Sequence, residues 1–352
     1  MAKAEIEVAA AVLWRREADK PDEARDGIAG QQRARQFLLT QRPHDKVYAG
    51  YWEFPGGKIE AAESPAQALQ RELAEELAIM VRTEDLRPWI SRRYSYPHAE
   101  VCIHFLQAHD WSGTLSLREH TACTWCLAGN SPHVAPLLPA NASVFRGLCL
   151  PTSMWISNAT DNGVVAETKR ASQALSTLRS RHMLPPLVQL RDKTLPLAER
   201  ADLGLQLKSM LQDVSRESNT PETPTLVVNA SNAEGEEAEL ARQIKADGLH
   251  LTGSALVEIQ QRPHFSWVGA SVHDAAQLRR ASLLNLDYAV LGSVLPTSSH
   301  PMEAGLGWSR FGELIKGCPL PVYAIGGMTR QMQVEATRHG AHGTAHMRRW
   351  AD

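Results

Sequence analysis

The sequence predicts two domains in one chain, a strand-rich domain built around one strong helix and a C-terminal (β/α)8 barrel of the TIM type. A chain of 352 residues exceeds the size at which one hydrophobic core keeps growing. Near Leu150 the pattern changes to short apolar runs that alternate with helical patterns, which is typical of a parallel barrel. We assign residues 1–135 to the first domain, 136–150 to a short helix and linker whose Asn141 packs with that domain, and 151–352 to the barrel. A single long barrel is the competing interpretation.

Composition and charge indicate an ordinary globular protein. Hydrophobic residues make up 43% and charged residues 22% of the chain, which excludes bulk disorder. The formal net charge of −2 gives no overall attraction to nucleic acid or membrane, so we expect neither as a partner and expect anionic ligands to be held locally. The apolar run Val8–Trp14 is too short for a secretion signal, and five scattered cysteines do not form a disulfide framework. These features favour the reducing cytoplasm.

The first domain is predicted to contain four strands, and a short helix follows it. A polar, glycine-containing segment at Arg16–Gln32 has the composition of a hairpin loop. Cys123 and Cys126 form a C-x-x-C pair, but no second pair stands at zinc-ligand spacing, so we interpret them as half-buried strand thiols. The expected elements are strands Ile6–Trp14, Arg35–Gln41, Tyr94–His109 and Thr121–Leu127 and helix Asn141–Leu148.

The barrel prediction rests on eight short apolar runs, each a candidate strand. They are Ser153–Ser157, Leu187–Leu190, Thr225–Asn229, Gly248–Leu251, Trp267–Ala270, Tyr288–Gly292, Val322–Ile325 and Gly343–His346.

The strong helix of the first domain has a well-specified start. Ser64 is a good N-cap, Pro65 suits the first helical position, and Gln67 completes an S-x-x-Q capping box. The leucines that follow repeat every four residues and predict the buried stripe; they are Leu69, Leu73 and Leu77.

Three carboxylates share another face of this helix. Glu72, Glu75 and Glu76 stand at i, i+3 and i+4, and Arg71 offsets only part of their repulsion, about 0.2–0.5 kcal/mol for a helical pair. A divalent cation would neutralise the rest, and hard oxygen ligands suit Mg²⁺, with Mn²⁺ as the alternative. Because the Gly56-Gly57 turn lets the backbone approach the same ion and its phosphates, the pattern favours phosphate chemistry over a merely solvated helix face.

The segment Gly57–Ile79 resembles the Nudix box, G-x5-E-x7-R-E-U-x-E-E-x-G-U with U apolar, at every defined position but one, where Ala78 replaces glycine. The resemblance implies an α/β/α sandwich with a mixed sheet, so the chain combines the α+β and α/β classes. It also implies pyrophosphohydrolase chemistry, with Glu72, Glu75 and Glu76 binding metal. Glu63 would support the loop–helix geometry and Arg71 would orient the carboxylates.

The approach to the box, Gln41–Pro43 and Gly50–Glu60, and the segment Leu138–Asn141 resemble the MutT type, which acts on oxidised guanine nucleotides such as 8-oxo-dGTP. The resemblance implies a nucleoside triphosphate substrate. The residues that it assigns are Arg42 to phosphate or sugar, the Glu53-Phe54 backbone to the base, Asn141 to the base edge, Tyr96 to base stacking, and Gly56 and Glu119 to the metal. Outside the resemblance, Tyr96 is a half-buried strand aromatic and Glu119 a solvated loop acid.

The C-terminal half resembles thiamine-phosphate synthase and its TenI relatives in several strand-closing pieces, among them Gln189–Lys193, Ala246–Leu251 and Leu291–Thr297. The resemblance implies a site for a phosphorylated thiazole or thiamine-like ligand. The residues assigned to it are Arg191, Lys193, Asn229, Ser271, His273, Thr297, Gly326 and Gly327. Two expected magnesium-binding acids are replaced by Ala230 and Ala255, which makes synthase activity doubtful. In the TenI branch a histidine serves a metal-free tautomerisation, for which His273 is the candidate; the alternatives are ligand binding, a structural role, and helix capping.

The leading hypothesis is therefore a Mg²⁺-dependent hydrolase that converts 8-oxo-dGTP or a related triphosphate to the monophosphate and pyrophosphate. The alternative is a thiamine-related salvage protein, which would hydrolyse damaged thiamine diphosphate species or bind or tautomerise a thiazole phosphate.

Overall fold

The computed structural model describes residues 5–15, 35–180, 183–218, 220–297 and 304–347, so the predicted loop Arg16–Gln32 lies outside the described residues. The described chain divides into two compact units near Leu148. None of the helices in the described ranges is long and apolar enough to cross a membrane.

The first unit contains two sheets and two main helices. The first sheet is mixed, in the order β4-β1-β6-β5, with β1 and β6 parallel and the outer pairs antiparallel. The second sheet is antiparallel, in the order β3-β2-β7. The elements are β1 (Glu5–Leu13), β2 (Gln36–Gln41), β3 (Trp52–Glu53), β4 (Gly56–Lys58), α1 (Pro65–Leu77), η3 (Thr83–Asp85), β5 (Leu86–Ser95), β6 (Glu100–Ala108), β7 (Ala122–Leu127), η4 (Pro139–Asn141) and α2 (Ala142–Leu148).

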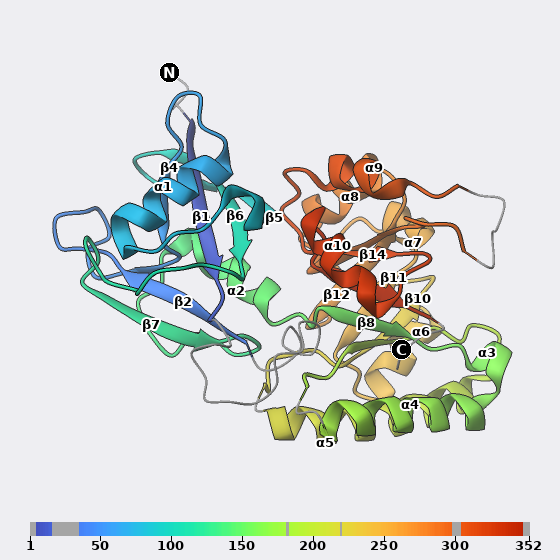
Figure 1. Ribbon diagram of the computed structural model, residues 1–352. Coiled ribbons are helices and arrows are strands. Elements are labelled where there is room, and N and C mark those ends of the chain that lie inside the picture. The colour runs from blue at the N-terminus through green and yellow to red at the C-terminus, as the bar shows by residue number, and fades with distance from the viewer. Residues whose placement is uncertain (1–4, 16–34, 181–182, 219, 298–303, 348–352) are drawn as a thin grey trace. The chain divides into compact units, whose positions relative to one another are not determined.

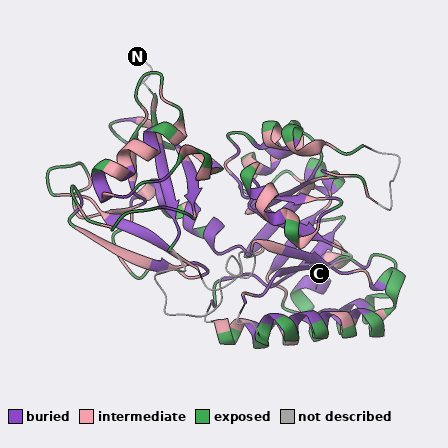
Figure 2. Ribbon diagram, in the orientation of Figure 1, coloured by how far each residue is buried: buried purple, intermediate pink, exposed green. Residues whose placement is uncertain are grey.

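The central strand β1 is apolar on both faces, because each face is covered by a different helix. Ala9 and Ala11 pack in one core cluster with the leucines of α1, whereas Ala10 and Val12 pack in another with α2. Figure 1 shows α1 lying beside β1, and Figure 2 shows β1 as buried along most of its length. This arrangement confirms the predicted α/β/α sandwich with a mixed sheet.

The predicted strand Tyr94–His109 is wrong in its extent, because the structure has two strands, β5 and β6, joined by a tight turn. The turn closes at Tyr96, whose backbone N–H donates to the carbonyl of Ala99 at 2.8 Å. Most of β5 was not predicted, because Pro88 disfavours a strand. In the structure Pro88 lies at an irregularity in the pairing of β5 with β6 and lacks a backbone N–H to donate there.

The second unit is a closed barrel of eight parallel strands, in the order β10-β11-β12-β13-β14-β15-β8-β9, as predicted. The strands are β8 (Ser153–Ile156), β9 (Leu187–Leu190), β10 (Leu226–Ala230), β11 (Gly248–Leu251), β12 (Trp267–Val272), β13 (Tyr288–Gly292), β14 (Val322–Ile325) and β15 (Gly343–His346). The helical elements are α3 (Ala159–Asn162), α4 (Val164–Ser180), α5 (Leu197–Ser218), α6 (Glu236–Gln243), α7 (Gly253–Glu258), α8 (Ala275–Leu283), α9 (Gly307–Ile315), η5 (Arg330–Met332) and α10 (Gln333–Arg338).

Large side chains fill the barrel interior, and a small residue makes room for them. Tyr288 and Tyr323 are fully buried in the interior cluster, with ring centroids 5.7 Å apart. A Cβ built on Gly269 would lie 2.1 Å from the Tyr288 ring, so only glycine fits beside it. The outer faces of α4 and α5, which run side by side, are exposed (Figure 2). The barrel interior is therefore a packed core and not an open channel.

Candidate active site

The acidic helix α1 begins and ends as its sequence dictates. The Ser64 hydroxyl accepts from the Gln67 backbone N–H at 3.3 Å, and the Gln67 side chain accepts from the Ser64 N–H at 2.9 Å. At the other end Ala78 adopts the left-handed conformation, with φ 57° and ψ 27°, and its N–H donates to Leu73. The position that usually holds glycine in the Nudix box is therefore left-handed here too, at a cost of about 1–2 kcal/mol for a residue with a Cβ.

Arg71 joins three of the predicted carboxylates. Its guanidinium donates to both oxygens of Glu63 at 3.0 Å, to Glu72 at 2.8 Å and to Glu75 at 3.3 Å. It also donates to the carbonyl of Lys58 at 3.1 Å, which ties α1 to the end of β4. The hydrogen bond from Arg71 lowers the pKa of Glu63, and the same contacts raise the pKa of Arg71. Arg71 thus holds the carboxylates in place across the loop–helix junction.

Glu72 and Glu76 are the less exposed members of the acidic set. Burial raises the pKa of Glu72, and the neighbouring Glu76 raises it further against the opposing effect of Arg71. Glu76 is 4% exposed, and one of its carboxylate oxygens accepts from the Gly56 backbone N–H at 3.1 Å. A Cβ on Gly57 would lie 2.3 Å from the Glu72 carboxylate, so glycine is needed for this approach. An oxygen-only donor set around a glycine turn fits a hard divalent cation.

Two residues beside Glu76 were not assigned a role from the sequence. His120 is buried, and its Nε2 lies 3.1 Å from Glu76 Oε2. Burial acts to lower the pKa of His120, but the contact with Glu76 raises it overall. Lys46 donates to Glu119 at 3.1 Å. The position of His120 follows from the loop 118–120, where the Arg118 N–H donates to the carbonyl of Glu76, and no local pattern in the sequence predicts that contact.

Arg42, the predicted phosphate or sugar contact, forms an ion pair with both carboxylate oxygens of Glu53. Arg42 donates to the two Glu53 oxygens at 2.7 and 2.6 Å. Burial raises the pKa of Glu53, whereas Arg42 opposes this shift. Phe54 is buried in the core against Phe37, with ring centroids 5.7 Å apart, so its ring serves the core of the first unit.

The segment that contains Asn141 is held next to Tyr96 and to β3. The Ala140 N–H donates to the Tyr96 hydroxyl at 3.4 Å, and Leu138 pairs with Trp52 through a 2.9 Å backbone hydrogen bond. Asn141 is 3% exposed, yet its Nδ2 has no hydrogen-bond partner among the described residues. Tyr96 itself is buried among aromatic rings, which raises its pKa to about 12. The fold therefore gathers an aromatic platform and an unsatisfied amide donor at one place.

In the barrel, most of the predicted ligand residues lie at the carboxyl ends of strands. Asn229 on β10 is buried; its Oδ1 accepts from Gln189 at 2.8 Å, and its Nδ2 has no partner within the described ranges. Arg191 and Lys193, after β9, are exposed, and Thr297 after β13 is half-buried. Gly326 and Gly327, after β14, both have positive φ, at 97° and 66°.

Ser271 lies on β12, and His273 follows just after this strand. The carbonyl of Gly292 is 3.1 Å from His273 Nδ1, so that nitrogen must carry the proton and donate. In the neutral imidazole Nε2 then keeps its lone pair. Ser271 contacts His250, a residue that the sequence analysis did not single out: the Ser271 hydroxyl lies 2.9 Å from His250 Nε2. The other ring nitrogen of His250 lies 3.2 Å from the Tyr288 hydroxyl.

Acid should destabilise the barrel through His250. Burial, with smaller contributions from Arg191 and Lys193, lowers its pKa from 6.5 to about 3. The unfolded chain binds this proton below pH 6.5 and the folded protein does not, so stability present above pH 6.5 is lost towards pH 3, at about 1.4 kcal/mol per pH unit. Urea unfolding at pH 7.5 and 5 should show a smaller pH effect in His250→Asn. The pKa of His346 is lowered to about 4, so His346 should preserve part of the pH effect in the variant. Equal pH effects in the natural protein and in His250→Asn would contradict the role of His250.

The structure places the two alanines that the sequence analysis assigned to expected acid positions. Ala230 closes β10 and Ala255 lies in α7, and both are buried. Neither offers an oxygen ligand from its side chain.

Comparison with known proteins identifies both parts of the chain. A family model described as "Thiamine monophosphate synthase" matches residues 160–349, and one described as "NUDIX domain" matches residues 24–145. The chain is 42% identical over 108 residues to CTP pyrophosphohydrolase of Escherichia coli, which is 30% of this chain and 76% of the relative. It is 33% identical over 121 residues to 8-oxo-dGTP diphosphatase of Haemophilus influenzae, 34% and 87% of the two chains.

The barrel has relatives of a different kind. It is 32% identical over 165 residues to thiamine-phosphate synthase of Natronomonas pharaonis, which is 45% of this chain and 71% of the relative. The domains predicted from the Nudix box and from the strand-closing pieces of the barrel are therefore both present. The chain belongs to the thiamine monophosphate synthase family through its barrel and to the Nudix family through its first domain, which makes it a hydrolase of acid anhydrides in phosphorus-containing compounds.

Proposed function

We propose that the first domain is a Mg²⁺-dependent nucleoside triphosphate pyrophosphohydrolase that converts 8-oxo-dGTP or a related triphosphate to the monophosphate and pyrophosphate. The observation that carries this proposal is the acidic face of α1, where Glu72 and Glu76 approach the Gly56-Gly57 turn and Arg71 holds the flanking carboxylates. A solvated helix face would not be buried against a glycine turn in this way.

The metal would be held by Glu72, Glu75 and Glu76, with the carbonyl of Gly56 and the carboxylate of Glu119 as further oxygen donors. Magnesium, when bound, supplies charge neutralisation for the phosphates and lowers the pKa of water. Mn²⁺ would serve the same ligands. Arg71 keeps the carboxylates oriented throughout, because its hydrogen bonds reach three of them.

Phosphate and base are proposed to bind on either side of this acidic face. Lys46 and Arg42 are each paired with a carboxylate and can turn to phosphate oxygens when a triphosphate is present. The unsatisfied Nδ2 of Asn141 would donate to an acceptor on the base edge, and its Oδ1 would accept from a donor. Since the relatives are named for both a purine and a pyrimidine triphosphate, the base is the part of the substrate that needs measurement.

The test is a substrate panel with the full chain: 8-oxo-dGTP, dGTP, CTP and thiamine diphosphate, with pyrophosphate or phosphate release as the readout. We expect the highest kcat/KM for 8-oxo-dGTP. In Asn141→Ala this value should fall about 10- to 100-fold, since a lost buried hydrogen bond to the base is worth about 1–3 kcal/mol. Ser143→Ala, two residues further along, is the matched control. Preference for thiamine diphosphate would overturn the substrate, and no turnover of any triphosphate would overturn the proposed function.

For the barrel we propose binding of a phosphorylated thiazole or thiamine-like ligand in place of synthase activity. The proposal is supported by Ala230 and Ala255, which remove two magnesium ligands, and by the exposed His273, whose Nε2 is left free to exchange a proton with a bound ring. Titration calorimetry of the full chain with a thiazole phosphate, compared between the natural protein and His273→Ala, distinguishes binding from a purely structural barrel.

A further inference from the structure

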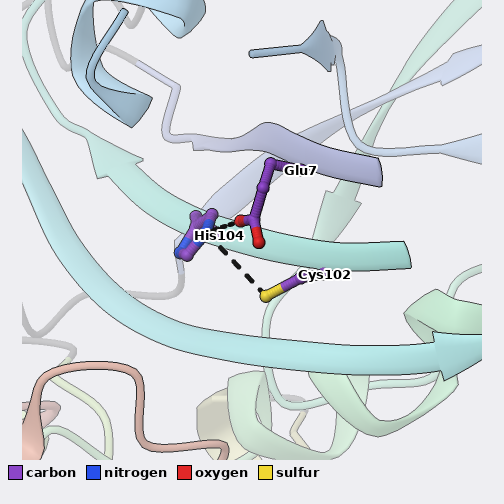
Figure 3. A group of neighbouring side chains, drawn as sticks. All are labelled: Glu7, Cys102 and His104. Atoms are coloured by element: carbon purple, nitrogen blue, oxygen red, sulfur yellow. Dashed lines mark hydrogen bonds and ion pairs between the residues drawn. The ribbon is translucent and has the colours of Figure 1, made fainter. Parts of the chain in front are cut away.

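A group of potential metal ligands outside the acidic helix lies on the sheet of the first unit. β1 and β6 are parallel neighbours, and their register places Glu7 directly opposite Cys102. His104 follows Cys102 by two residues, so all three side chains leave the same face of the sheet. Figure 3 shows the three side chains pointing toward one another from the two strands.

The potential ligand atoms of these residues lie close together. All of them are within 4.8 Å of one another. The distance is 2.5 Å from His104 Nε2 to Glu7 Oε2 and 3.8 Å from His104 Nε2 to Cys102 Sγ. Zinc takes a thiolate at about 2.3 Å and an imidazole nitrogen at about 2.0–2.1 Å in tetrahedral geometry. Three ligand atoms this close together could hold one such ion.

Neighbouring residues support a cation at this place. Ser91 on β5 lies opposite His104, and its hydroxyl is 2.9 Å from His104 Nδ1, so it can accept the Nδ1 proton and leave Nε2 as the ligand. Arg93 pairs with Glu5 at 2.8 Å. Glu5 and Glu7 carry two negative charges against the one positive charge of Arg93, and a bound metal would displace the proton of the Cys102 thiol.

We propose that Glu7, Cys102 and His104 form a second metal site, one that takes a thiophilic divalent cation of the Zn²⁺ type. A set of one sulfur, one nitrogen and one oxygen ligand selects zinc or cobalt over magnesium, which prefers oxygen alone. Glu7 is partly exposed and His104 half-buried, so the ion can enter from solvent and keep a water as its fourth ligand. The ion would tie β1 to β6, the parallel pair at the centre of the mixed sheet.

Cobalt(II) is the probe for the experiment, added to the full chain in excess Mg²⁺ so that the acidic helix is occupied. We expect one equivalent of Co²⁺ to give the visible bands of a tetrahedral centre and a near-ultraviolet sulfur-to-cobalt band, and Zn²⁺ to displace it. Cys102→Ser should abolish the sulfur band. Cys126→Ser is the matched control, because Cys126 also faces a histidine, with its Sγ 3.9 Å from His133 Nδ1, but has no carboxylate in its group.

The support from Ser91 is tested separately. Ser91→Ala should weaken Co²⁺ binding about 10- to 100-fold while the sulfur band at saturation is unchanged, since its hydroxyl orients a ligand and is not one. The melting temperature of the natural protein should rise with Zn²⁺, and that of the Cys102→Ser variant should not. A sulfur band that survives in Cys102→Ser, or the absence of any sulfur band in the natural protein, would overturn the proposal. Neither result bears on pyrophosphate release.

Discussion

Replacement Glu76→Gln is expected to lower kcat for pyrophosphate release by at least about 10²-fold, the lower end of what a group acting in proton transfer or charge stabilisation contributes. Glutamine keeps the size of the side chain and an oxygen that can accept from the Gly56 N–H, so the turn stays in place. The charge is lost, and with it the electrostatic attraction for a divalent cation. Steady-state kinetics at saturating Mg²⁺, with thermal unfolding to verify the fold, measures this effect.

Glu84→Gln is the control for Glu76→Gln, because Glu84 is an exposed acid on η3 whose ion pair among the described residues is with Arg82, at 3.5 Å. Its activity should equal that of the natural protein. Raising the Mg²⁺ concentration should restore part of the activity of Glu76→Gln if the lost interaction is with the metal. A folded Glu76→Gln protein with undiminished turnover would contradict the placement of the catalytic site on α1.

The second large effect is expected from Gly57→Ala. The backbone of Gly57 has no positive φ, so alanine is compatible with its conformation. The new methyl group would lie 2.3 Å from the carboxylate carbon of Glu72 and must displace it. A displacement of about 1 Å in a catalytic group costs about 10²-fold in rate. We expect this loss in kcat/KM with little change in the unfolding temperature, because the clash is with the far end of a flexible side chain.

Gly312→Ala provides the matched substitution elsewhere in the chain. A Cβ at Gly312, on α9, would make an ordinary contact of 3.5 Å with the His339 carbonyl and should slightly stabilise the helix. Hydrolysis should be unaffected. Full activity in Gly57→Ala would mean that catalysis does not depend on the observed position of Glu72. It would contradict the proposal that the glycine turn brings the metal ligands together.

The sequence analysis was most successful where the information is local. A capping box, a four-residue leucine repeat and three glutamates on one face determine α1 from its own residues, and the structure shows Ser64, Gln67 and the leucine stripe in those roles. The barrel strands were also predicted nearly to the residue, because a buried parallel strand is a continuous apolar run between turn signals.

Prediction failed where pairing across the chain overrides local preference. β5 begins with Leu86, Arg87 and Pro88, which do not favour a strand alone and are held there by pairing with the apolar β6. His120 gave no signal because a lone histidine in a loop is usually at the surface. It becomes part of the site only because the loop 118–120 binds the end of α1.

By itself, the sequence determined the two fold classes and the acidic helix with its arginine. These depend on residue type and on spacing within one element, which the chain carries whatever its tertiary structure. Only the tertiary structure decided that Gly57 meets Glu72, that Tyr96 meets the Asn141 segment, and that Glu7 meets Cys102 and His104. These contacts join residues from 15 to 97 positions apart, and a contact between distant residues exists only once strands pair and helices pack over them.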